Sequence, residues 1–108
     1  MDLNFDAFFK SIKTEVVSLA QESLKDSITE AKADGLAALN SMKENIKKWS
    51  LQVVNKEISI EDFDFQIQTQ KEEMEMVALK EAGLKEIELD KFKKGIVSII
   101  VNKVSGLV

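Results

Sequence analysis

Apolar residues recur at helical spacing through the first half of the chain. They fall three or four residues apart, with one wider gap across Gly35, and no proline interrupts them. This spacing places them on one face of an amphipathic helix. The positions are Ile12, Val16, Ala20, Leu24, Ile28, Ala31, Leu39, Met42, Ile46, Trp49 and Val53. We therefore predict one long amino-terminal helix over residues about 6–54.

The apolar face changes direction along this predicted helix. On a helical wheel of about 100° per residue, the apolar side chains up to Leu19 point one way, and those from Leu24 onwards point about 110° away. The change arises from successive four-residue steps between Ile12 and Ile28, each of which advances the face by about 40°. Such a pattern favours slight right-handed winding, and a local change of direction equally suits two different packing partners.

Gly35 lies inside this predicted helix, directly after Asp34. It is either the residue that ends a shorter helix or an interior glycine, which costs about 1 kcal/mol relative to alanine. The apolar face keeps its phase from Leu24 through Val53, and a loop would have no reason to preserve that phase. We therefore expect the helix to continue through Gly35.

Ser59 marks the start of a second helix. Asp62 follows three residues later, which is close to a capping box, and Ile58 before the cap can pack on Phe63. Gly83 suits the left-handed position just after a helix, with Leu84 covering the end. These signals predict a helix over residues about 60–82, with apolar positions at Ile60, Phe63, Ile67, Met74, Val77 and Ala78.

The last segment keeps helical spacing from Leu89 to about Ser105. Residues 95–101 are rich in β-branched side chains, which are also compatible with a strand. An isolated strand would have no partner in this chain, so we predict a helix over about 89–105. The fold class is then all-α. We expect one domain over residues 1–108, built as an elongated antiparallel helical bundle from these three helices.

Composition narrows the chemistry. The chain contains no Cys and no His, and all 15 of its basic residues are lysine. Without cysteine there is no disulfide or thiolate nucleophile, and without histidine the usual general base and the commonest metal ligand are missing. We therefore expect no enzyme activity, no metal site, no cofactor and no small-molecule substrate.

Charge and hydropathy bear on partners and location. The net charge of −4 repels phosphate backbones, and arginine, which reads base edges best, is absent, so we expect no nucleic-acid partner. No basic start is followed by an apolar core of about 7–15 residues, as in a signal peptide. No run reaches the roughly 18–20 apolar residues of a spanning helix. We expect a cytoplasmic protein.

Two charged groups have candidate roles. Carboxylates at helical spacing hold metals in di-iron bundles, but those sites also need histidine, so we interpret the acidic group as a solvated face. Its members are Glu61, Asp62, Asp64, Glu72, Glu73 and Glu75. Lysines surround the apolar face of the last helix at positions 91, 93, 94 and 103, which is typical of a membrane-surface helix. We favour a core helix with solvated lysines and keep membrane-surface binding as the alternative function.

The aromatic start of the chain is the candidate contact surface. Three phenylalanines within five residues are costly to leave in water, at roughly 1.5–3 kcal/mol per side chain. They pack either on the last helix of the same chain or on another molecule. Two overlapping shorter helices would also leave part of a first helix of about 70 Å uncovered. We therefore predict a non-enzymatic interaction or assembly module that forms a homo-oligomer or binds a helical protein, through Phe5, Phe8, Phe9, Ile12, Val16 and Leu19.

Overall fold

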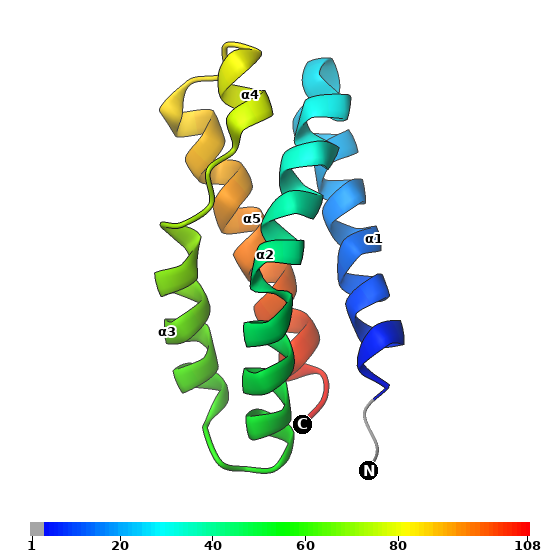
Figure 1. Cartoon of the computed structure of the whole chain (residues 1–108), viewed down its shortest axis with the longest axis vertical. Coiled ribbons are helices and arrows are strands. Elements are labelled where there is room, and N and C mark those ends of the chain that lie inside the picture. The colour runs from blue at the N-terminus through cyan, green and yellow to red at the C-terminus, as the bar shows by residue number, and fades with distance from the viewer. Residues whose placement is uncertain (1–3) are drawn as a thin grey trace.

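Figure 1 shows a computed structural model of the chain, which describes residues 4–108. In order along the chain, the helices are α1 (Phe5–Ser23), the short 3-10 helix η1 (Lys25–Ser27), α2 (Ile28–Val54), α3 (Ile60–Lys71), α4 (Val77–Glu81) and α5 (Glu86–Ser105). No strand occurs between residues 4 and 108. Helices α1, α2, α3 and α5 run alternately up and down along a body of 43 × 24 × 19 Å. The predicted all-α antiparallel bundle is confirmed.

Four helices enclose one core. Helix α1 packs against α2 and α5, α3 packs against the same two helices, and α4 lies on α2. Helices α1 and α3 therefore occupy opposite flanks of the bundle (Figure 1). The accessible surface of 6483 Å² is close to the roughly 6,000 Å² expected for a compact monomer of this mass. A single copy thus covers its own apolar faces.

The predicted helix over about 6–54 is instead two antiparallel helices. Leu24 leaves the helical region with φ −129° and ψ 58°, η1 follows, and α2 begins at Ile28. Asp26 and Ser27 lie in this turn, where short polar side chains compete with helical hydrogen bonds. The 27 residues of α2 span about 40 Å, so the reversal fits both helices into the 43 Å length of the bundle.

The helix does continue through Gly35, as predicted. A Cβ atom placed on Gly35 would lie 2.8 Å from Val16 Cγ1 in α1 and 3.4 Å from Phe92 Cζ in α5. A Cβ on Gly95 would lie 2.7 Å from Leu19 Cδ2. The absence of these two Cβ atoms lets α2 and α5 approach α1 closely.

The predicted helix over about 60–82 is also two helices. Its start is confirmed, because Ser59 Oγ accepts the Asp62 N–H at 3.0 Å and Asp62 Oδ2 accepts the Ser59 N–H at 3.2 Å. Helix α3 ends at Lys71. Gly83 has φ +92°, which confirms its left-handed position, but the helix that it follows is the short α4.

The link between α3 and α4 is non-helical and places two side chains in the core. Met74 and Met76 are both buried, and a two-residue spacing on one side suits an extended chain. Met76 has φ 51°, in the left-handed region. Acidic residues in 72–75 lie just beyond the carboxyl end of α3, where the helix dipole disfavours negative charge. The break changes the helical phase, so Val77, predicted as core, is 51% exposed.

Helix α5 begins at Glu86, three residues before the predicted start, and remains helical through residues 95–101. The Glu88 carboxylate accepts the backbone N–H of Lys85 at 3.2 Å, which satisfies a donor at the helix start. Ion pairs then connect α5 to its neighbours. Lys71 Nζ of α3 lies 3.1 Å from Asp90 Oδ1, and Lys103 Nζ lies 2.7 Å from Glu15 Oε2 of α1.

Candidate functional site

The residues predicted to contact a partner lie mostly inside the bundle. Phe5, Phe9, Ile12 and Val16 are buried, with exposed fractions of 7%, 2%, 0% and 0%. Phe8 and Leu19 are half-buried against the same core. These six side chains therefore pack fully or partly against the core of a single copy. Of the six, Phe8 and Leu19 keep the most surface available to another molecule.

Two phenylalanine rings in α1 gather lysines from α1 and α2. The Phe5 and Phe9 rings stack with their centroids 5.5 Å apart. The ammonium groups of Lys13 and Lys43 lie 5.1 and 5.5 Å from the Phe9 centroid, and that of Lys47 lies 5.9 Å from the Phe5 centroid. The negative face of an aromatic ring attracts cations at these distances. The reversal between α1 and α2 thus concentrates positive charge on this flank.

A shallow groove lies on the surface between α1 and α2, next to these lysines. Val17 and Leu36 supply its apolar part, and Lys10 and Lys13 supply its positive charge. The cavity measures about 440 Å³. We call it the lysine groove; its lining residues are Lys10, Lys13, Thr14, Val17, Ser18, Gln21 and Leu36.

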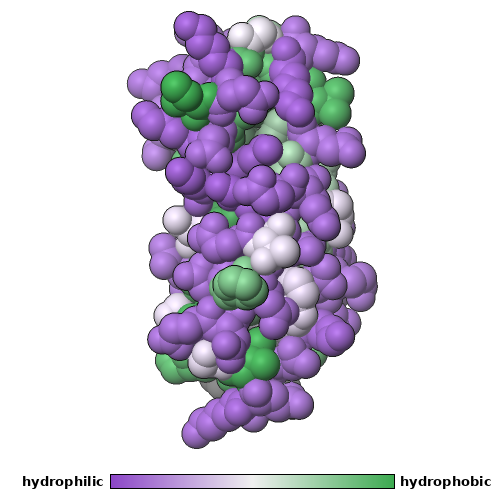
Figure 2. Space-filling model, turned by 90° about the vertical axis from the view of Figure 1, so that its left-hand side faces the viewer, coloured by the Kyte–Doolittle hydropathy of each residue, from purple (hydrophilic) through white to green (hydrophobic). Residues whose placement is uncertain are grey.

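The opposite flank of the bundle carries an exposed aromatic residue among acids. Phe65 of α3 is 75% exposed. The residues three and four positions away in both directions, together with Glu72 seven positions later, share its side of the helix, and all of them are polar and exposed. We call this surface the acidic face of α3; it consists of Glu61, Asp62, Phe65, Gln68, Thr69 and Glu72. Figure 2 views this flank, where hydrophobic residues appear as separate spots within a hydrophilic surface.

The acidic residues of segment 61–75 do not converge. They are distributed along α3 and the link to α4. Within residues 4–108, no three Asp or Glu side chains are grouped so that they could hold a metal ion. Their common property is negative charge on the surface.

The chain matches no protein-family model, no curated protein and no solved structure.

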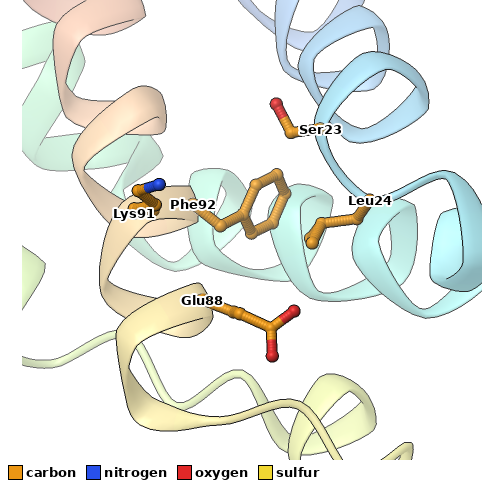
Figure 3. A pocket seen from close by; sticks show the side chains of 5 residues that line it. All are labelled: Ser23, Leu24, Glu88, Lys91 and Phe92. Atoms are coloured by element: carbon orange, nitrogen blue, oxygen red, sulfur yellow. The ribbon is translucent and has the colours of Figure 1, made fainter.

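A cavity of about 340 Å³ opens between the end of α1 and the start of α5 (Figure 3). Phe92 and Leu24 point toward each other and supply its apolar wall, while Ser23, Glu88 and Lys91 line its polar side. The Glu88 carboxylate is already engaged, because it accepts the Lys85 N–H. The polar groups of this cavity are exposed, so any charge here interacts through solvent.

Asp34 is a charged residue in the buried part of the bundle, with 9% of its surface exposed. Its Oδ1 accepts the N–H of Ala78 at 3.1 Å, and its Oδ2 accepts the N–H of Leu79 at 2.7 Å. Both donors belong to the first turn of α4, and Met76 before that turn provides no side-chain cap. Asp34 therefore caps α4 from the neighbouring helix, which is a structural role.

The lysine-rich last helix turns its apolar side to the core. The buried residues of α5 are Leu89, Phe92, Ile96, Val97, Ile100 and Val104. Two of its lysines form ion pairs, Lys94 with Asp90 and Lys103 with Glu15. Membrane-surface binding through this apolar side would require α5 to leave the bundle. In the part of the chain that the structure describes, no helix is long and apolar enough to cross a membrane.

The lysine groove and Phe65 are not among the contact residues predicted from the sequence. The signal for Phe65 was present, because residue 65 lies about 200° around a helix from Phe63, which is buried. The groove required knowledge of the reversal at Leu24, since that reversal brings Leu36 beside Val17.

Proposed function

We propose that this chain is a non-enzymatic helical interaction and assembly module that binds other copies of itself. One observation supports the proposal: lysines gather where α1 meets α2, and an acidic surface lies on α3, which is on the opposite flank of the bundle from α1. Among the described residues, no ion pair joins these lysines to the acids of α3, so the two surfaces do not pair within one molecule. Two copies placed side by side bring them together.

The strength of such a contact follows from its chemistry. Each copy already buries its core, so association joins folded units through their surfaces. Exposed ion pairs contribute about 0–1 kcal/mol each, and salt screens them. Electrostatic complementarity mainly sets orientation and association rate. We therefore expect weak, reversible assembly that depends on protein concentration and ionic strength.

Light scattering after size-exclusion chromatography tests the proposal. The expected mass exceeds 12.1 kDa at a protein concentration of about 0.5 mM in low salt. The mass is lower in about 0.5 M NaCl, where the Debye length is about 4 Å and the ion pairs are screened. A mass of 12.1 kDa under all conditions rejects self-association.

Sedimentation with anionic liposomes in low salt provides the comparison with membrane-surface binding. We expect the protein to remain in the supernatant. Sedimentation that Lys94→Glu abolishes would instead favour the α5 surface as a membrane contact, because that lysine lies on the exposed side of the helix.

A further inference from the structure

The geometry points to a directional contact in which Phe65 of one copy enters the lysine groove of the next copy. This inference rests on the self-association proposed above and specifies its surface. Phe65 is 75% exposed on α3, and the lysine groove opens between α1 and α2 on the other flank.

The groove suits an aromatic side chain in size and lining. The groove is shallow and open, and its volume of about 440 Å³ leaves room for one phenyl ring to lie against its apolar floor. Val17 and Leu36 offer half-buried apolar surface to the ring. Burying a phenylalanine that is exposed in the free molecule contributes roughly 1.5–3 kcal/mol before the cost of association.

The charges around the two surfaces are complementary. Lys10 and Lys13 line the groove, while Glu61 lies one helical turn from Phe65. Docking the ring therefore brings carboxylates toward ammonium groups. The same lysines also lie where they can contact the ring face, as Lys13 already does with Phe9 at 5.1 Å.

The contact does not close on itself. A two-fold interface uses the same patch on both copies, whereas Phe65 and the lysine groove are different patches on opposite flanks. Each dimer keeps one unused groove and one unused Phe65. Further copies add at both ends, so the predicted product is an open chain of molecules whose length grows with concentration.

Two complementary variants test this arrangement by sedimentation velocity at about 0.5 mM protein in low salt. Phe65→Asp removes the ring and keeps the groove. Lys10→Glu with Lys13→Glu reverses the groove charge and keeps Phe65. We expect each variant alone to associate at least about tenfold more weakly than the wild type. An equimolar mixture forms dimers of twice 12.1 kDa and nothing longer, because it contains one intact pair of surfaces.

Matched controls change exposed residues outside the proposed contact. Ile87→Asp replaces another apolar side chain, 74% exposed at the start of α5, and Lys80→Glu reverses a charge on α4. Both should assemble like the wild type. Circular dichroism establishes that each variant is folded, and Lys10→Glu alone replaces the double variant if the half-buried Lys13 cannot be changed.

The outcomes separate this inference from the proposed function. A wild-type protein that stays at 12.1 kDa overturns both. A wild type that assembles while Phe65→Asp assembles equally well overturns the contact and retains self-association. A mixture of the two variants that stays monomeric also overturns the contact, since it shows that the two surfaces do not bind each other.

Discussion

Asp34 in α2 and Leu79 in α4 are joined by a 2.7 Å hydrogen bond, in which the Asp34 carboxylate accepts the Leu79 backbone N–H. The same carboxylate accepts the N–H of Ala78 at 3.1 Å. Helix α4 has only five residues, and helices of this length are unstable in isolation. Its position therefore depends on this cap and on Leu79, which is fully buried.

Replacing the capping carboxylate should destabilise the protein. Asp34→Ala leaves two N–H groups of α4 without partners, and we expect a loss of about 1–3 kcal/mol in the free energy of unfolding. Asp34→Asn keeps one acceptor and should lose less. Urea titration measures these changes. Glu44→Ala, at an exposed position of α2, is the control and should stay within about 0.5 kcal/mol of the wild type. Equal effects at the two positions would contradict the capping role.

The two interior glycines should respond differently to alanine. A Cβ on Gly35 would lie 2.8 Å from Cγ1 of Val16, which is fully buried and branched at Cβ, so we expect destabilisation by about 1–3 kcal/mol. Gly95→Ala meets a terminal methyl group of the half-buried Leu19, which can rotate away. The helix propensity gained there, about 1 kcal/mol, should then offset most of the strain. Thermal melts of both variants test this order. A Gly35→Ala protein that melts at a higher temperature than the Gly95→Ala protein would refute it.

A stability measurement can distinguish burial of Phe9 within one copy from burial of Phe9 at a contact between copies. Phe9 is 2% exposed within a single copy, so Phe9→Ala should lower the free energy of unfolding by about 3–5 kcal/mol. Phe8 is half-buried, so Phe8→Ala should lower the free energy of unfolding by clearly less than Phe9→Ala does. The loss at Phe9 should not depend on protein concentration. A loss that disappears on dilution would instead place Phe9 at a contact between molecules.

Acid should weaken the link between α3 and α5. Hydrogen bonds from Lys94 and Lys71 hold the pKa of Asp90 below its ordinary value of 3.8. A lowered pKa in the folded state means that the ionised carboxylate stabilises the fold above about pH 3.8, and that this contribution disappears as the pH falls through the folded-state value. The difference in melting temperature between the wild type and Asp90→Asn should therefore be largest near neutral pH. It should vanish in strong acid, and a difference that grows on acidification would contradict this assignment.

Local signals in the sequence were sufficient for much of the fold. The Ser59 and Asp62 pair located the start of α3, and the constant phase of apolar residues showed that Gly35 does not end a helix. Both of these signals come from residues that are close together in the sequence. The helix ends at Ser23 and Lys71 were missed because apolar spacing continues past each of them. The bend in the apolar face near residues 20–24 marked the reversal, but a bend in direction does not distinguish a turn from a second partner.

The surface features were harder to predict than the core. Lys43 and Lys47 contact the Phe9 and Phe5 rings because α2 folds back along α1, a contact that no continuous helix allows. The same reversal buries Phe5 and Phe9 of the aromatic start, for which the sequence predicts a contact with a partner. The missed turn at Leu24 therefore explains why side chains that were expected on the surface lie in the interior.

The order of the helices also bears on how the chain folds. Helices α1 and α2, and helices α2 and α3, pack as consecutive pairs, so each pair meets after a short connection with a small entropic cost of closure. The pairing of α1 with α5 has the greatest separation in sequence, since it joins the two ends of the chain and includes the Glu15–Lys103 ion pair. Topologies dominated by local contacts fold in microseconds to milliseconds. The docking of α5 between α1 and α3 therefore closes the longest loop, so it has the largest entropic cost of closure and completes the cooperative unit.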